Sequence, residues 1–332
     1  MGYSVREQPF DFSAHSLWAF PLFGAGVGIV GLALLPLLRS PTASSGTALI
    51  VCIAGVLLFE ILAWKIGIGA RMPGTTVRND ANLIAVRGDG PISTWLVAHV
   101  DTKAQVQSMA GRLISIWVVV IAVVVLILLA GWRLVGGAPL SFSAAAAGPG
   151  IALIAAIFAA GSRLKGSSPG ARDNGTGLLA VLSAAEERPD GTLGIILTGA
   201  EEFGLLGARH LARAEPALFR GTEVVNLDTL ADRGGFYVVS HNTRAASLAN
   251  RLQTRLEALG LPVTQRHLPM GILVDSLAVA RLASGAVTVA RLDWEVLRLM
   301  HTPRDTGQGL DPGFAEAVGR LIGRSFRSGQ TV

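Results

Sequence analysis

The sequence predicts an α/β domain, whose largely parallel sheet is covered by helices on both faces, together with four transmembrane helices. In the second half of the chain, short apolar runs bounded by turn residues alternate with helical segments, the usual pattern of parallel strands and their connecting helices. In the first half, four apolar segments are each about long enough to cross a bilayer, which takes roughly 20 residues. The chain is 51% hydrophobic and only 15% charged, and ordinary soluble enzymes are less apolar.

Charge and cysteine content exclude several classes of protein. The net charge is +5, but the basic residues form no run and are not interleaved with aromatic residues, so we expect no nucleic-acid partner. The single cysteine, Cys52, excludes an internal disulfide and a metal site built from cysteines. The acidic residues Glu7 and Asp11 precede the first apolar segment, which disagrees with a secretory signal peptide.

The four expected membrane spans come in two pairs: Leu17–Leu38 and Thr47–Trp64, then Leu113–Trp132 and Ser141–Ala160. In the first span, Gly24 and Gly28 form a GxxxG pair, which favours close packing against another helix. We therefore expect four parts along the chain. These are an N-terminal segment with two spans (1–66), the first part of the soluble domain (67–112), an inserted membrane hairpin (113–160) and the remainder of the soluble domain (161–332).

The elements of the soluble domain follow from apolar periodicity, turn residues and helix caps. The expected strands are Asn82–Arg87, Thr94–Ala98, Leu193–Leu197, Glu223–Asp228, Phe236–Ser240 and Ala286–Leu292. The expected helices are Gly177–Glu187, Leu205–Ala214, Ala245–Leu259, Asp275–Ala283 and Phe314–Phe326.

The stretch Thr198–Gly207 joins a buried strand to a helix and contains the adjacent residues Glu201 and Glu202. Open α/β sheets bind their ligands at this kind of position. One carboxylate could bind a cation while the other moves a proton. Alternatively, both glutamates only interact favourably with the positive end of the helix dipole.

Other histidine and acidic residues also follow expected strands or precede helices: His99, Asp173, Asp228 and His301. Each has a simpler explanation, as a helix cap, a turn residue or a loop histidine. Together with Glu202 they fit a pair of Zn²⁺ ions, whose four positive charges balance three carboxylates and a bridging hydroxide, with one histidine for each ion. Paired metals of this kind suit hydrolysis, and Glu201 remains as the general base.

Five segments in these regions, AHVD, SPGARDNGTG, GAEEFGLLGARHL, VVNLD and HTPRDT, resemble the M28 family of zinc metallopeptidases, in the family's order. The resemblance covers about residues 80–112 and 163–327, and GARDNGTG with EEFGLLG is its strongest part. It implies a mixed, largely parallel sheet between helices.

The resemblance also implies a role for each site residue. His99 and Asp228 would hold one zinc, Glu202 and His301 the other, and Asp173 would bridge the two ions. Glu201 would take a proton from the metal-bridging water. Asp101 would orient the His99 imidazole.

Three features depart from the family pattern. Asp101 and Asp173 are 72 positions apart, because two membrane spans are inserted between them. Thr229 and Leu230 follow VVNLD, where Met and Gly are more usual in the family. No residue can be assigned to a substrate amino terminus, so the prediction of a hydrolase is firmer than that of an exopeptidase.

The resulting prediction is a membrane-bound di-zinc metallopeptidase, with an aminopeptidase reaction on a peptide substrate favoured. The alternatives are a carboxypeptidase or glutaminyl cyclase with M28-like chemistry, and a non-catalytic membrane receptor or scaffold on the same fold. A small transporter is a further alternative, supported only by the four spans and Glu60 within the second of them.

The orientation follows from basic residues near the ends of the spans. One side carries Lys65, Arg71, Lys103, Arg112, Arg163, Lys165 and Arg172, whereas the opposite loops carry only Arg39 and Arg133. Because basic residues concentrate on the cytoplasmic side, we expect a multi-pass protein of the cell membrane with its catalytic domain in the cytoplasm.

Overall fold

The computed structural model describes residues 2–44, 46–69, 76–136, 138–187 and 192–325. The chain forms two compact units. Unit 1 comprises Met1–Phe12, Val77–Ala104 and Gly166–Val332, and unit 2 comprises Ser13–Thr76 and Gln105–Lys165. The expected position of Arg71 and the expected helix end at Phe326 lie outside the described residues.

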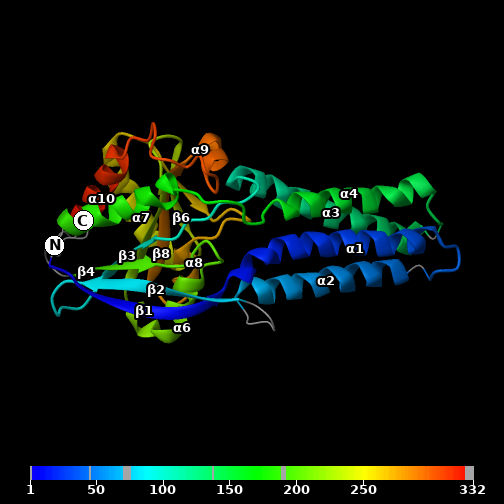
Figure 1. Cartoon of the computed structure of the whole chain (residues 1–332), viewed down its shortest axis with the longest axis horizontal. Coiled ribbons are helices and arrows are strands. Elements are labelled where there is room, and N and C mark those ends of the chain that lie inside the picture. The colour runs from blue at the N-terminus through cyan, green and yellow to red at the C-terminus, as the bar shows by residue number, and fades with distance from the viewer. Residues whose placement is uncertain (1, 45, 70–75, 137, 188–191, 326–332) are drawn as a thin grey trace. The chain divides into compact units, whose positions relative to one another are not determined.

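Unit 1 is built on an eight-stranded mixed sheet with strand order β1-β2-β4-β3-β5-β8-β6-β7 (Figure 1). The strands are β1 (Ser4–Ser13), β2 (Val77–Val86), β3 (Thr94–His99), β4 (Leu193–Thr198), β5 (Glu223–Leu230), β6 (Gly235–Ser240), β7 (Val263–His267) and β8 (Gly285–Leu292). The central pairs β4–β3, β3–β5 and β5–β8 are parallel, whereas β2 and β6 pair with this centre in antiparallel orientation. The expectation of a mixed, largely parallel sheet is confirmed.

Helices pack on both faces of this sheet. On one face lie α5 (Thr176–Glu187), α7 (Ala246–Leu256) and α10 (Gly313–Ser325), and on the other lie α6 (Leu206–Ala214) and α8 (Asp275–Val279). The central strands are buried on both sides, so apolar runs such as Leu193–Thr198 show little alternation. α9 (Trp294–Leu299) follows β8 and leads into the loop that contains His301.

Strand β1 differs from the sequence prediction, which placed residues 1–16 with the membrane segment. β1 joins the edge of the sheet beside β2, and the buried Asn82 side chain donates to Gln8 Oε1 at 2.8 Å. Phe10 is buried and its ring stacks on His210 of α6. Three further elements were not predicted or were shorter than predicted: β7 and α9 were missed, and α8 ends at Val279 rather than Ala283.

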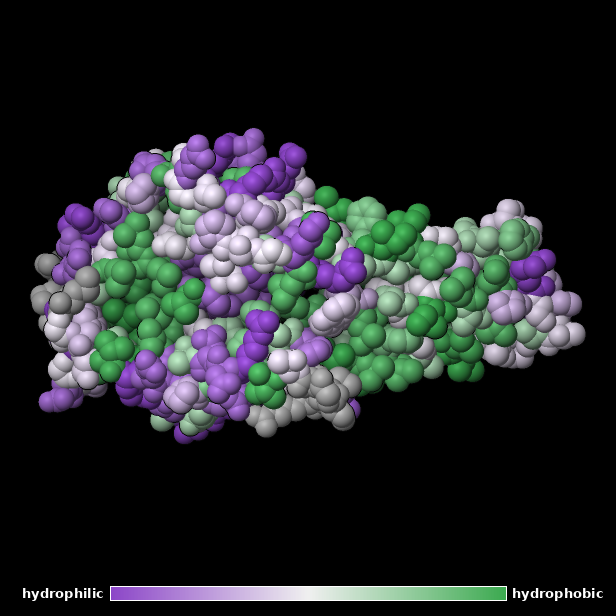
Figure 2. Space-filling model, viewed as in Figure 1, coloured by the Kyte–Doolittle hydropathy of each residue, from purple (hydrophilic) through white to green (hydrophobic). Residues whose placement is uncertain are grey.

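The described residues of unit 2 form four long helices, α1 (Ala19–Arg39), α2 (Thr47–Gly67), α3 (Met109–Gly136) and α4 (Phe142–Ala160), which run side by side (Figure 1). Together with the short helix that precedes α1, all four are long and apolar enough to cross a membrane. Apolar side chains cover much of their visible surface (Figure 2), and many large ones are exposed, including Ile50, Leu128 and Ile157. Such an exposed apolar surface favours burial in lipid.

Small residues allow α1 and α4 to approach closely, as the GxxxG pair predicted. A Cβ atom added at Gly24 would lie 2.3 Å from Ala159 Cβ, and one added at Gly28 would contact Ala156 Cβ at 3.5 Å. The Gly24 position therefore has no room for a side chain unless the helices separate.

We expect Gly24→Ala to lower the stability of the detergent-solubilised protein, because overpacking costs typically about 1–3 kcal/mol. Gly150→Ala is the matched control within α4, since a Cβ there meets nothing within 4 Å, and alanine is the better helix former. Thermal unfolding of both variants checks this. Equal melting temperatures for the two variants would show that α1 and α4 do not pack closely at Gly24.

Candidate active site

The predicted site residues converge at one end of the central strands of unit 1. His99 is the last residue of β3, Glu201 and Glu202 follow β4, and Asp228 lies near the end of β5. Asp173 lies in the turn before α5, and His301 lies just beyond α9. Because β3, β4 and β5 are parallel, residues at their carboxyl ends meet at one edge, where α/β sheets place their sites.

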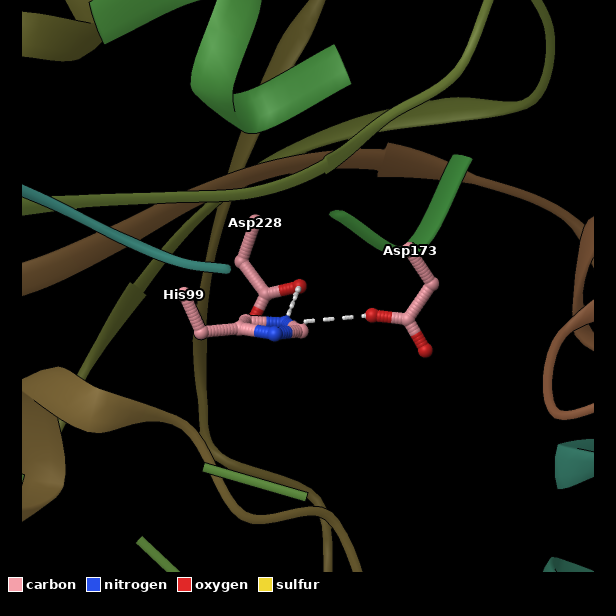
Figure 3. A group of neighbouring side chains, drawn as sticks. All are labelled: His99, Asp173 and Asp228. Atoms are coloured by element: carbon pink, nitrogen blue, oxygen red, sulfur yellow. Dashed lines mark ion pairs between the residues drawn. The ribbon is translucent and has the colours of Figure 1, made fainter. Parts of the chain in front are cut away.

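The first group of candidate metal ligands is His99, Asp173 and Asp228 (Figure 3). His99 Nε2 lies 3.2 Å from Asp173 Oδ1 and 3.9 Å from Asp228 Oδ1. The two carboxyl groups approach the imidazole from different sides, and the second Asp173 oxygen is turned away from it.

The second group is Asp173, Glu202 and His301. His301 Nε2 lies 3.3 Å from the other Asp173 oxygen, Oδ2, and 3.1 Å from Glu202 Oε2. Asp173 therefore belongs to both groups and presents one oxygen to each histidine. The structure brings together all five residues for which the sequence suggested metal binding.

These donors suit a pair of divalent cations in charge as well as in kind. Imidazole nitrogens and carboxylate oxygens are ligands that zinc accepts. Four carboxyl groups are buried here, those of Asp173, Glu201, Glu202 and Asp228, and buried carboxylates require compensating positive charge. In addition, Glu202 Oε1 is buried with no hydrogen-bond partner among the described residues, so an acceptor is available to an ion.

The pKa shifts of these carboxyl groups reflect their burial and their closeness to one another. Burial raises the pKa of Glu201 well above its usual range, and the carboxylates of Asp275, Glu202 and Asp228 add to the shift against the opposing charge of His99. Burial likewise raises the pKa of Asp228 to about 6. Burial also opposes ionisation of Asp173, but its hydrogen bonds with His301 and His99 outweigh that cost and hold its pKa below the usual range.

Asp101 lies in the site but contacts different atoms from those expected. Its carboxylate oxygens accept hydrogen bonds from the main-chain N–H groups of Glu201 and Glu202, at 2.9 and 3.1 Å. His99 Nδ1 lies 3.0 Å from the Asp101 main-chain oxygen and 3.8 Å from its carboxylate. The Asp101 side chain thus holds the turn that carries both glutamates, and its main chain is the nearer partner of the imidazole.

Several contributing residues escaped the sequence analysis. Asp305 accepts from the main-chain N–H groups of Arg172 and Asp173, at 3.0 and 3.2 Å, and so fixes the Asp173 turn. Lys103 lies buried against Glu202, and burial raises the pKa of the nearby Asp275 to about 7. Asp305 lies within the motif HTPRDT and Lys103 lies two residues after AHVD, but only tertiary contacts reveal what they touch.

Backbone conformation also marks this site. Among the described residues, the non-glycine residues with positive φ are Ala200, Leu205, Thr229 and His301, at 48° to 61°. His301 is itself a site residue, and the other three lie within three positions of one in the sequence. Such backbone conformations are costly and concentrate at functional sites. Thr229, one of the departures from the family pattern, donates its hydroxyl to Asp228 Oδ1 at 3.0 Å.

Comparison with known proteins identifies the family. The sequence profile described as Peptidase family M28 matches residues 157–325. The chain belongs to peptidase family M28. The matched region contains Asp173, Glu201, Glu202, Asp228 and His301, whereas His99 and Asp101 precede it. No curated protein matches the chain in sequence.

Solved structures resemble the chain at low identity. A leucine aminopeptidase precursor from Bacteroides thetaiotaomicron VPI-5482 has 13% identity and a TM-score of 0.50, with 92% of this chain and 97% of that chain covered. Porphyromonas gingivalis glutaminyl cyclase has 16% identity and a TM-score of 0.51, with 91% and 96% covered. These two likenesses show a shared fold.

An aminopeptidase from Aneurinibacillus sp. strain AM-1 has 15% identity and a TM-score of 0.47, with 76% of this chain covered. This M28 chain spans about half the length of that protein, 48%.

Proposed function

We propose that this M28 chain is a membrane-bound di-zinc metallopeptidase that acts as an aminopeptidase. The observation that carries the proposal is the pair of ligand groups that share Asp173, one oxygen facing each histidine. His99 and Asp228 would hold one zinc, Glu202 and His301 the other, and Asp173 would bridge them. When bound, the two ions would polarise the scissile carbonyl and lower the pKa of the attacking water.

Glu201 is the group available to move a proton. It is buried beside the ligands but belongs to neither ligand group. Burial raises its pKa well above the usual range, and a carboxylate whose pKa is raised is the stronger base. In the proposed reaction, Glu201 accepts the proton of the attacking water and passes it to the leaving amine. Asp101 acts as a positioning residue, because it holds the turn that carries both glutamates.

A panel of substrates tests the reaction on the purified full-length chain. We expect hydrolysis of aminoacyl amides with a free amine, loss of hydrolysis after metal removal by a chelator, and recovery with added zinc. Hydrolysis of peptides with a blocked amine and a free carboxylate would instead indicate a carboxypeptidase. Ring closure of N-terminal glutamine would indicate a glutaminyl cyclase. Metal binding without turnover of any substrate would favour a receptor or scaffold.

We further propose that the four apolar helices of unit 2 span the cell membrane and that the catalytic domain faces the cytoplasm. Their length and composition support the spans. The excess of Lys and Arg on the side that carries residues 65–112 supports the orientation.

A C-terminal fusion tests this orientation. We expect a fluorescent reporter that matures only in the cytoplasm to be active, and a phosphatase reporter that needs export to be inactive, because short-loop basic residues set topology. The opposite pair of results would place the catalytic domain outside the cytoplasm and would leave the proposed chemistry unchanged.

A further inference from the structure

A single lysine is buried among the site carboxylates. Lys103 Nζ lies 2.8 Å from Glu202 Oε2 and 3.0 Å from the Glu202 main-chain oxygen. The side chains of both residues are at least 95% buried. Fully buried lysines are rare unless they are paired, so this ammonium is a fixed positive charge within the site.

The two ligand groups consequently differ in electrostatic environment. Glu202 Oε2, which also contacts His301, forms an ion pair with the ammonium of Lys103. Asp228 instead accepts from the neutral hydroxyl of Thr229, and among the described residues neither His99 nor Asp228 has an ion pair with a lysine or an arginine. Arg172, which precedes Asp173 in the sequence, is paired with Asp305.

We propose that Lys103 is a positioning residue that makes the Glu202–His301 position the weaker of the two metal positions, so that the His99–Asp228 position fills first. The proposal rests on the di-zinc site proposed above. A divalent ion at the Glu202–His301 position must share a carboxylate with a fixed ammonium, and two positive charges a few ångströms apart repel strongly in a buried site. This repulsion is weaker at the other position, because Lys103 contacts Glu202 and, among the described residues, has no ion pair with His99 or Asp228.

A second effect of Lys103 on zinc affinity has the opposite sign. Lys103 holds the Glu202 carboxylate and main chain, and groups that orient metal ligands generally strengthen binding, with removal costing about 10- to 100-fold in affinity. When the charge of Lys103 is removed, the first effect predicts tighter zinc binding at the Glu202–His301 position and the second predicts weaker binding. The direction of the change in zinc affinity therefore decides between them.

Zinc titration of the metal-free, detergent-solubilised full chain measures this directly, without reference to activity. We expect two equivalents per chain whose affinities differ by about tenfold or more, taking the scale of effects from groups around metal ligands. In Lys103→Met the weaker equivalent should tighten by about 10- to 100-fold. Lys103→Arg, which keeps the charge, should retain the weak equivalent.

Three further variants complete the design. Lys103→Gln keeps an N–H donor for the Glu202 main chain but removes the charge, so it should tighten zinc binding at the same position. It replaces Lys103→Met in the test if that variant does not fold. Arg251→Met is the matched control, because it removes a positive charge from a surface ion pair with Glu223, and it should change neither affinity. Glu202→Gln should weaken or abolish only the weaker equivalent, which assigns that equivalent to its position.

Two results would overturn the proposal: equal affinity of the two equivalents in the unaltered chain, or weaker or unchanged binding in the neutral variants. The outcome is separable from the proposed function. Unequal zinc binding without peptide hydrolysis would refute the function alone. Hydrolysis by a chain that binds two zinc ions equally would refute the role of Lys103 alone.

Discussion

Glu201→Gln should lower kcat by about 10²- to 10⁴-fold, the usual contribution of a general base, while zinc content stays unchanged. The reason is that Glu201 lies in neither ligand group, and an amide cannot accept the proton that the carboxylate accepts. Steady-state kinetics on an aminoacyl amide, with metal analysis of the same preparation, checks both halves of the expectation.

Glu202→Gln is the matched control, since it makes the same chemical change one residue further along the chain. Glu202 contacts His301 within the second ligand group, so this variant should lose zinc as well as activity. If both variants lose zinc to the same extent, or if Glu201→Gln keeps full activity, the proposed division of roles between the two glutamates is wrong.

Asp173→Ala should have the largest effect on metal content, because one carboxylate serves both ligand groups. We expect loss of most of both zinc equivalents and of activity. Asp228→Ala provides the comparison, since Asp228 belongs to one group only, and this variant should keep the equivalent held by Glu202 and His301. Metal analysis by mass spectrometry measures both variants, and circular dichroism confirms that they fold.

The two variants discriminate between a shared ligand and two independent sites. Full metal in Asp173→Ala would refute the bridging role. Equal loss in Asp173→Ala and Asp228→Ala would mean that the two positions cannot fill separately, which also contradicts independent roles for the ligands.

The sequence predicted the central strands well because their surroundings leave a clear pattern. β3, β4, β5 and β8 are buried on both faces, so each appears as an apolar run bounded by turn residues. The edge strands lack that pattern. Residues Thr264–His267 of β7 are exposed, and β1 contains Pro9 together with charged residues, a composition typical of edge strands.

The candidate ligand residues could be named from the sequence because they occupy strand ends and short motifs, and the structure brings them close enough together that they could hold a metal ion. The residues that contact these candidate ligands or lie close to them could not be named from the sequence. Lys103, Asp275 and Asp305 act through contacts with segments about 77 to 132 positions away or through the shared field of the site. Such contacts depend on the tertiary fold, and one sequence contains no local signal for them.

The insertion between Asp101 and Asp173 also shows that the site depends on tertiary contacts. Its 72 positions include α3 and α4, which belong to unit 2, yet the chain re-enters unit 1 at Gly166. Asp173 is then positioned mainly by residues that are distant in the sequence. Asp305 accepts from its main-chain N–H, and the neighbouring Asn174 side chain bonds to Leu227 and Thr229, as well as to Gly177 nearby. The site is therefore assembled by these hydrogen bonds, and its ligands need not be close in the sequence.

The measurement that tests the central claim most directly is the zinc content of the purified full-length chain after saturation with zinc and removal of unbound metal. Two ligand groups that share Asp173 predict close to two zinc ions per chain, both lost on treatment with a strong chelator. A chain that retains no zinc, or that keeps its full zinc content when Asp173 is replaced by alanine, would contradict a di-zinc centre at this site.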